Sequence, residues 1–194
     1  MVQFRHPHPR TSRKLDSPLP VTRFAIAALL SCSTLGALAQ PTLQAPNVVA
    51  ISPNLVTSGQ PDAAELAGLS RQGFGAVISL SPPTVHSAVR GEDEIVRRQG
   101  LEFVNIPVNF GNPTEADFRA FVEALNRLRD RKVLVHCEVN MRASTMTFLY
   151  RVSVDHDDPE EAYKSVARVW SPHGVWKALM VSQLRKAGVA FDPY

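Results

Sequence analysis

The sequence has few cysteines, few aromatic residues and no hydrophobic run long enough for a confident membrane span. Its cysteines are Cys32 and Cys137, and aromatic residues make up 7% of the 194-residue chain. The longest apolar stretch, residues 24–38, has about 15 residues, whereas a transmembrane helix needs about 20. No repeat or low-complexity segment interrupts the chain. These absences exclude a disulfide scaffold and a repeat protein, and they predict no stable membrane span.

Residues 1–39 are typical of an export signal. Five Lys or Arg residues precede the apolar stretch, and the Ala-Leu-Ala at 37–39 fits a cleavage site. We therefore expect cleavage after residue 39 and an exported domain, periplasmic or secreted, at 40–194. Two alternatives stay open, a lipoprotein anchor at Cys32 and an uncleaved membrane anchor.

The charge balance excludes another class of partner. The chain has 21 basic and 18 acidic residues, of which residues 1–39 hold five and one. The domain at 40–194 therefore has 16 basic and 17 acidic residues. Because nucleic-acid binding needs a strongly basic face, we expect no DNA or RNA partner. No group of His, Cys, Asp or Glu has metal-ligand spacing, and we predict neither a metal nor a cofactor.

Short apolar runs alternate with helical patterns, which predicts one α/β domain with a central, mostly parallel sheet flanked by helices. The expected strands are 47–51, 55–57, 76–80, 102–108 and 132–136. The expected helices run from Asp62 to a stop at Gly73, over 92–98, from Thr114, from about Ala143 to Val154 and through the C-terminal region 159–188. In such sheets, ligands bind beyond the carboxyl ends of the strands, so segments 81–82, 109–110 and 137–144 should meet.

Segment 133–144 places Cys137 at the end of an apolar, β-branched run, with Arg142 five residues later and a helical pattern following. Backbone N–H groups at such a turn, together with the positive end of the helix, favour a thiolate and an oxyanion. Arg142 can hold two oxygens of that oxyanion, and Ser144 is a candidate to assist the sulfur or a leaving group. His136 is expected to fix the loop through its ring nitrogens. The alternative is a buried, inert cysteine.

With these residues in view, the chain resembles the cysteine-dependent tyrosine and dual-specificity phosphatases, and more closely the small bacterial phosphatase-like domains of beta-lactamase-hydrolase-like proteins. The resemblance covers about residues 48–155 and is carried by Thr-Ser-Gly-Gln-Pro at 57–61, Ile-Pro-Val at 106–108 and Val-His-Cys at 135–137. It implies phosphoryl transfer through a phosphocysteine on Cys137. Arg142 and the loop amides would bind the phosphate. The binding loop would comprise His136, Glu138, Val139, Asn140, Met141 and Ala143.

Two positions depart from the family pattern. Five residues separate Cys and Arg in the family, whereas four separate Cys137 from Arg142, and Ala143 stands where the arginine is expected. The family's general acid, an aspartate after the Ile-Pro-Val strand, is replaced by Asn109. An amide cannot supply a proton, and losing acid catalysis costs about 10² to 10⁴ in rate. The loop also lacks a glycine, and Asn140 is the residue able to take a left-handed conformation in its place.

Three functions therefore stay open. A phosphatase would need another acid, and Glu115 and Asp117 are near in sequence, although helix capping explains both. A non-catalytic module that binds an oxyanion would fit Asn109 and Ala143. A rhodanese-type sulfurtransferase would fit the Cys-x4-Arg spacing, although strand 76–80 lacks the Asp-x-Arg pattern expected there.

Two tryptophans near the C-terminus, Trp170 and Trp176, form the other feature of note. We expect them to pin the last helix onto the core, because large aromatic side chains bury extensive apolar area. A partner surface is the alternative.

Overall fold

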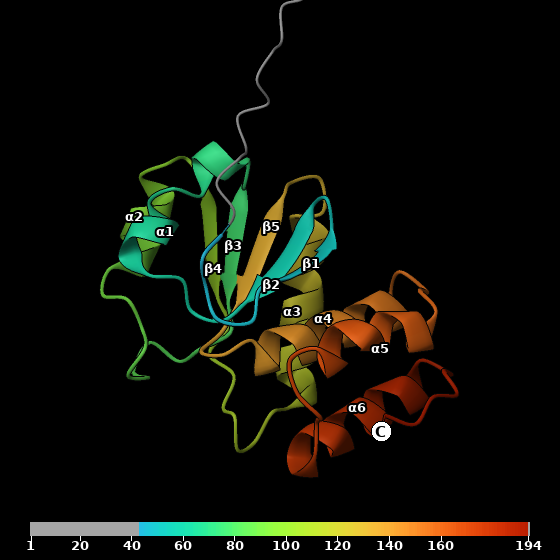
Figure 1. Ribbon diagram of the computed structural model, residues 1–194. Coiled ribbons are helices and arrows are strands. Elements are labelled where there is room, and N and C mark those ends of the chain that lie inside the picture. Colours follow the sequence, from blue (N-terminus) through green and yellow to red (C-terminus); the bar gives the residue numbers. More distant parts are fainter. Residues whose placement is uncertain (1–42, 194) are drawn as a thin grey trace, which may run out of the picture. The chain divides into compact units, whose positions relative to one another are not determined.

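The computed structural model describes residues 43–193, so the predicted export signal and Cys32 lie outside the described residues. Within this range a five-stranded sheet has the order β1-β2-β5-β3-β4 (Figure 1). The strands are β1 (Val49–Ser52), β2 (Leu55–Ser58), β3 (Ala76–Ser79), β4 (Glu102–Asn105) and β5 (Val133–His136). The helices are α1 (Ala63–Leu66), α2 (Glu92–Arg97), α3 (Glu115–Arg127), α4 (Met141–Ser153), α5 (Pro159–Ala167) and α6 (Gly174–Lys186).

The sheet is mostly parallel, which confirms the predicted class. Strand β5 pairs in parallel with both β2 and β3, and β3 pairs in parallel with β4, while β1 joins β2 as an antiparallel hairpin. His136 at the end of β5 is in register with Ser58 on one side and Ser79 on the other, and Ser79 is in register with Asn105. The carboxyl ends of four strands therefore form one row, beyond which a site can be built.

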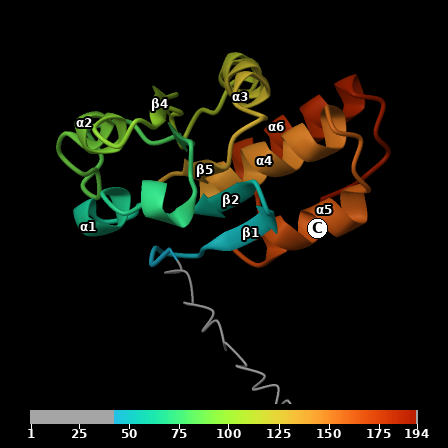
Figure 2. The ribbon, with the colours of Figure 1, turned by 90° about the horizontal axis from the view of Figure 1, so that it is seen from above.

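Each face of the sheet packs against its own helices (Figure 2). Helices α1 and α2 cover one face, where Leu134 belongs to a core cluster with residues of both helices. Helices α3 and α4 cover the other, where Val133, Val135 and Cys137 belong to the larger cluster, and α5 and α6 pack against α4. Because side chains alternate along a strand, His136 faces α2 while its neighbour Cys137 faces α4. This alternation separates two residues that are adjacent in sequence.

The predicted helix from Asp62 to Gly73 is wrong in length. The structure has α1 over four residues and then a 3₁₀ turn at Ser70–Gln72, after which Gly73 takes a left-handed φ of 80°. Gly68 interrupts the helical pattern, and a glycine inside a helix costs about 1 kcal/mol relative to alanine. The cap at Asp62 is present, since its carboxylate accepts from the Glu65 N–H at 2.8 Å.

The C-terminal helices lie within the predicted region 159–188. Asp158 accepts from the Glu161 N–H at 2.9 Å, and Pro159 occupies the first turn of α5, where its missing N–H costs nothing. Trp176 on α6 is 1% exposed and belongs to the larger core cluster. The prediction that it pins the last helix onto the core is confirmed.

Candidate functional site at the end of β5

The loop after β5 is joined to the segment after β2 by backbone hydrogen bonds. The Cys137 N–H donates to the Ser58 carbonyl at 3.2 Å, and the Gln60 N–H donates to the Glu138 carbonyl at 3.1 Å. Gly59 makes this approach possible, because a Cβ there would lie 2.7 Å from the Pro46 Cβ and 2.9 Å from the Glu138 oxygen. A larger residue at this position would push the two segments apart.

The segments after β3 and β4 reach the same place. The Leu80 N–H donates to the His136 carbonyl at 2.8 Å, and the Val108 N–H donates to the Leu80 carbonyl at 3.2 Å. Arg142 completes the chain of contacts, because its Nε donates to the Val108 carbonyl at 3.1 Å. The expected meeting of segments 109–110 and 137–144 is confirmed, because the centre of the Phe110 ring lies 5.2 Å from the guanidinium carbon of Arg142. After β3 the residue bonded to both neighbouring segments is Leu80, and not residues 81–82 as expected.

Asn140 sets the shape of the loop. It takes the left-handed conformation considered from the sequence, with φ 72° and ψ 0°, and it directly precedes α4. Its side-chain amide donates to the Asn47 carbonyl at 2.6 Å and to the Thr57 hydroxyl at 3.1 Å. These two bonds hold a conformation that costs roughly 1–3 kcal/mol for a residue other than glycine.

Asn140 contributes a left-handed backbone and two side-chain hydrogen bonds, and we predict that two substitutions can distinguish these contributions. Asn140→Gly keeps the left-handed backbone but loses both side-chain bonds, so unfolding free energy should fall by about 1–2 kcal/mol. Asn140→Val loses the bonds and strains the backbone, and should cost at least about 2 kcal/mol more. Denaturant titration of both variants measures the difference. An equal loss in the two would mean that the backbone conformation is unimportant.

Cys137 is fully buried, at 0% exposure, and belongs to the core cluster with Ala143 and Met146. No hydrogen bond to its sulfur is present within residues 43–193. The first turn of α4 follows it closely, and the N–H groups of that turn have no intrahelical acceptor. Polar N–H groups therefore lie near the sulfur in sequence, while its side chain has an apolar environment.

Arg142 does not point into solvent. It is 5% exposed, its Nε is fixed by the Val108 carbonyl, and its guanidinium carbon lies 5.2 Å from the centre of the Phe110 ring. In the part of the chain that the structure describes, the terminal nitrogens donate to no protein group, and no carboxylate pairs with the guanidinium. A buried cation without a counter-charge is costly, and a bound anion would offset that cost.

Helix α4 begins at Met141, two residues earlier than predicted, because Asn140 ends the loop with its left-handed turn. Arg142 thus lies in the first helical turn. Ser144 is buried, and its hydroxyl donates to the Met141 carbonyl at 3.2 Å. It therefore makes a bond within the helix and none to the sulfur. Ala143, in the position where the family has its arginine, is fully buried in the core.

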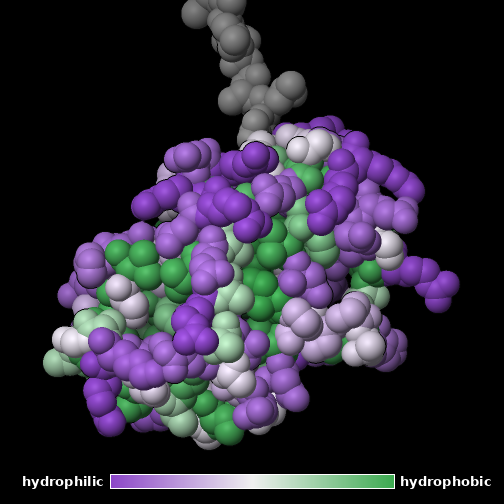
Figure 3. Space-filling model, turned by 180° about the vertical axis from the view of Figure 1, so that it is seen from behind, coloured by the Kyte–Doolittle hydropathy of each residue, from purple (hydrophilic) through white to green (hydrophobic). Residues whose placement is uncertain are grey.

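Exposed apolar side chains gather around the loop. On the face shown in Figure 3, apolar residues lie in patches between hydrophilic ones. Val139 is 39% exposed within the loop itself, and its carbonyl accepts from the Asn47 side chain at 3.0 Å beside the exposed Val48. Phe110, 38% exposed, lies against Arg142. Glu138, beside Val139, is half-buried. An apolar group on a ligand would find contacts here.

Glu115 and Asp117, the residues that could replace the missing general acid, have structural roles, and so does Asn109. Asn109 is exposed, and its side-chain oxygen accepts from the Gly111 N–H at 2.9 Å, which makes a local turn. Asp117 forms a reciprocal capping box with Thr114 at the start of α3. Glu115 is bonded to Lys186 of α6. The capping interpretation is confirmed for Asp117, and no carboxylic acid in this segment is left unengaged.

The pair Glu115–Lys186 leads to a pH-dependent prediction. The hydrogen bond from Lys186, and then its charge, hold the pKa of Glu115 below its ordinary value. Stability from this pair is therefore present above the ordinary glutamate pKa and lost as pH falls through the lowered value. We expect Lys186→Met to lower the melting temperature slightly near neutrality and to match the unmodified protein at about pH 3. Arg185→Met, in the same exposed turn, is the control and should show no such pH dependence.

Glu92 is a residue near the site that the sequence did not single out. The buried ring of His136 has its Nε2 atom 2.7 Å from the Glu92 Oε1 atom on α2. His136 therefore pairs the end of β5 with helix α2. The prediction that its ring nitrogens fix the loop is wrong, because neither of them forms a hydrogen bond within residues 43–193. Glu92 looked like one of three acids in a helical first turn, and only its burial distinguishes it. A single sequence carries no signal for that burial.

Trp170 and Trp176 pack against Phe110 and support the segment after β4. The Trp176 Nε1 donates to the Phe110 carbonyl at 2.9 Å, and both tryptophan rings lie within 6 Å of the Phe110 ring centre. Trp170 also donates to the Thr145 hydroxyl of α4 at 3.2 Å. The tryptophans thus fix α6 against the side of the site that carries Phe110.

Within residues 43–193, no group of three or more His, Cys, Asp or Glu side chains has the arrangement of a metal site. In the same range no helix is long and apolar enough to cross a membrane.

Known proteins resemble the chain in sequence and in structure. The family described as DSP-PTPase phosphatase fused to NAD+ kinase matches residues 49–186. A beta-lactamase hydrolase-like protein of Xylella fastidiosa is 34% identical over 108 residues, which are 54% of this chain and 25% of that protein. The match thus spans about a quarter of the relative.

Two solved structures extend the comparison. A DUF442 protein from Shewanella putrefaciens superposes with a TM-score of 0.68 at 28% identity, covering 74% of this chain and 94% of that one. TpbA of P. aeruginosa, solved with phosphotyrosine, superposes with a TM-score of 0.51 at 21% identity, covering 73% and 80%. The second similarity shows the fold alone.

Proposed function

The chain belongs to the family described as DSP-PTPase phosphatase fused to NAD+ kinase, and from this premise we propose that it hydrolyses a phosphomonoester through a phosphocysteine on Cys137. In the first step the thiolate attacks phosphorus, an S–P bond forms and the bond to the leaving oxygen breaks. In the second step water attacks phosphorus, inorganic phosphate leaves and the thiolate returns. Arg142 and the amides of the first turn of α4 hold the phosphoryl oxygens throughout.

The observation that carries this proposal is the state of Arg142. Its side chain is 5% exposed and fixed through Nε, while its terminal nitrogens have no protein partner in the described range. The free edge formed by the two terminal nitrogens of this fixed, planar cation matches two oxygens of a phosphoryl group. A phosphate dianion would also supply the counter-charge that no nearby carboxylate provides.

The absence of an unengaged acid after β4 restricts the substrate. With Asn109 turned to Gly111 and Asp117 in its capping box, the leaving oxygen departs without a proton from this segment. Good leaving groups tolerate that loss, so aryl phosphates should react faster than alkyl phosphates. The exposed Phe110 ring and the exposed valines around the loop favour the same choice, and the phosphotyrosine held by TpbA is an aryl phosphate.

A second candidate rests on a different observation. Cys137 is fully buried and its sulfur lacks a hydrogen bond in the described part of the chain, which suits a module that binds an oxyanion without turnover. Three assays on the full-length protein separate the candidates: phosphate release from an aryl phosphate, thiocyanate formation from thiosulfate and cyanide, and calorimetric phosphate binding. Phosphate release supports hydrolysis, thiocyanate supports a sulfurtransferase, and binding alone supports the module.

We predict that hydrolysis of an aryl phosphate requires the planar guanidinium group of Arg142. Arg142→Ala should lower kcat/KM for an aryl phosphate by about 10² to 10³, as for removal of one oxyanion donor elsewhere. Arg142→Lys should recover only part of this, because an ammonium group cannot bind two oxygens side by side. Arg168→Ala, an exposed arginine at the end of α5, is the matched control. Equal activity of all three variants would place phosphate binding elsewhere.

A further inference from the structure

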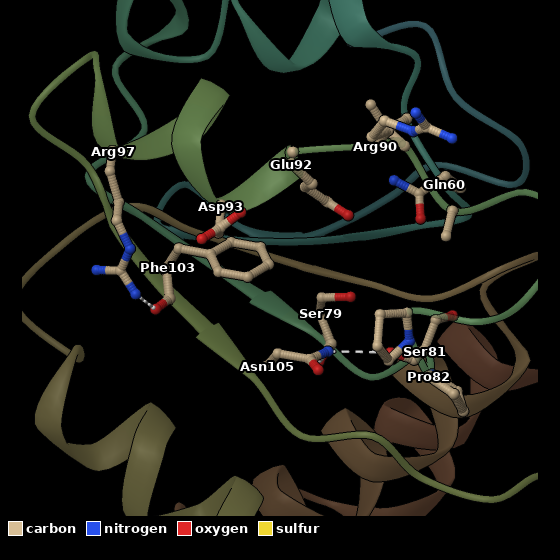
Figure 4. A pocket seen from close by; sticks show the side chains of 14 residues that line it. Gln60, Ser79, Ser81, Pro82, Arg90, Glu92, Asp93, Arg97, Phe103 and Asn105 are labelled. Carbon is tan, nitrogen blue, oxygen red and sulfur yellow. Dashed lines mark hydrogen bonds between the residues drawn. The ribbon is translucent and has the colours of Figure 1, made fainter.

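A cavity of about 680 Å³ opens on the face of the sheet that α2 covers (Figure 4). Its walls come from the ends of β3 and β4, from the segment between β3 and α2, and from Gln60 after β2. None of residues 137–144 lines it. The cavity is therefore a different hollow from the loop that carries Cys137 and Arg142, and it is of ordinary size for a small-molecule site.

The inner wall carries polar groups whose bonding capacity is not used. The Glu92 side chain is 11% exposed and points into the cavity in Figure 4. Its buried Oε1 lies 2.7 Å from the His136 Nε2 but forms no hydrogen bond of acceptable geometry within residues 43–193. Ser81 is 3% exposed, and its hydroxyl has no partner in the same range. Buried polar atoms without partners are uncommon, and a bound polar molecule would satisfy groups at this wall.

The side-chain oxygen of Asn105 is positioned to accept a hydrogen bond. Its amide nitrogen donates to the carbonyls of Ser79 and Ser81 at 3.1 and 2.9 Å, and the second of these bonds crosses the floor of the view in Figure 4. Because both donors of the amide are engaged, its oxygen is fixed in orientation. A ligand hydroxyl could donate to it without any cost for ordering the side chain.

The charges around the cavity cancel. Arg90 and Arg97 stand against Glu92 and Asp93, and Arg97 already donates to the Phe103 carbonyl at 2.8 Å. This balance contrasts with the unpaired Arg142 and favours neither an anion nor a cation. The half-buried Phe103 adds an apolar wall, together with prolines and valine of the segment before α2.

We propose that this cavity binds a neutral, hydroxyl-rich molecule with one apolar face, of the monosaccharide class. Carboxylates and amides accept from sugar hydroxyls, arginines donate to them, and an aromatic ring covers the C–H face of the sugar. The proposal does not depend on phosphatase activity.

The test is titration of the full-length protein with D-glucose, D-galactose, D-mannose and myo-inositol, followed by amide chemical shifts and calorimetry. We expect saturable binding of at least one of them, with shifts at Gln60, Glu92 and Asn105. Asp93→Asn and Phe103→Leu should each weaken binding about tenfold, as for one lost contact of this kind. Melting curves check that both variants fold, and Ser182→Ala, at an exposed position of α6, should bind unchanged.

Glucose 6-phosphate and inorganic phosphate serve as the charged comparison. Absence of saturable binding by every neutral compound overturns the proposal. So does tighter binding of the charged compounds at these same residues, or binding whose shifts fall on residues 137–144. Binding that Asp93→Asn and Phe103→Leu leave unchanged would also place the sugar elsewhere.

Discussion

Cys137→Ser should reduce release of phosphate from an aryl phosphate by at least about 10³-fold, because a serine hydroxyl beside the same amides is a far weaker nucleophile than a thiolate. The loss should appear in kcat, while phosphate still binds through Arg142 and the amides of α4. A single-turnover assay with acid quench would trap the phosphocysteine in the unmodified protein and none in the variant.

The burial of Cys137 makes a folding control necessary. The sulfur lies among apolar side chains with no hydrogen bond in the described range, so the serine hydroxyl costs about 1–3 kcal/mol there. Thr147→Val is the matched control on the same helix, because the Thr147 hydroxyl is also buried without a partner. It should keep its activity and lose no stability. Phosphate release that survives in folded Cys137→Ser would mean that another group is the nucleophile.

Trp176→Ala should lower the unfolding free energy by about 3–5 kcal/mol, the cost of removing a large aromatic side chain from a core. The ring is 1% exposed, packs in the larger core cluster and holds the segment after β4 through the Phe110 carbonyl. Because that segment also carries Val108, which fixes Arg142, activity should fall further than stability alone explains. Denaturant titration and kcat/KM measured well below the melting temperature give the two effects separately.

Trp176→Phe divides the effect of packing from that of the hydrogen bond. It keeps an aromatic ring but leaves the Phe110 carbonyl without its donor, and should cost about 1–3 kcal/mol. Trp170→Phe is the matched control, since Trp170 is only half-buried and donates to a hydroxyl that can rotate. If Trp176→Phe and Trp176→Ala lost equal stability, the hydrogen bond rather than the packing would hold α6.

Asn140 shows which features of the candidate site can be predicted from the sequence and which cannot. The left-handed Asn140 was foreseen, because the loop has no glycine and asparagine tolerates that conformation best. Its partners Asn47 and Thr57 were not, because they lie 93 and 83 residues away in the chain. The sequence also predicts the start of α4 two residues too late, because the turn before the helix is held by these distant partners. Local pattern does not reveal which long-range bonds hold a turn.

The two faces of the sheet show the same limit. Alternation places His136 and Cys137 on opposite faces, and this could be read from the chain once β5 was recognised. The pairing of His136 with Glu92 could not, because the charge pattern of α2 is that of any solvated first turn. The cavity beside Glu92 arises from segments around residues 60, 80, 92 and 105 and has no continuous motif.

The sequence by itself determined the class of fold and the order of its strands along the chain, and it singled out the loop for which we propose chemistry. Apolar periodicity and capping residues act over a few neighbours, so they are written locally. Only the tertiary structure decided that Arg142 is buried without a counter-charge, that Cys137 is enclosed by apolar side chains, and that a charge-balanced cavity exists beside Glu92. Burial and electrostatic pairing depend on residues brought together from distant parts of the chain, and they become defined only when the helices pack against the sheet.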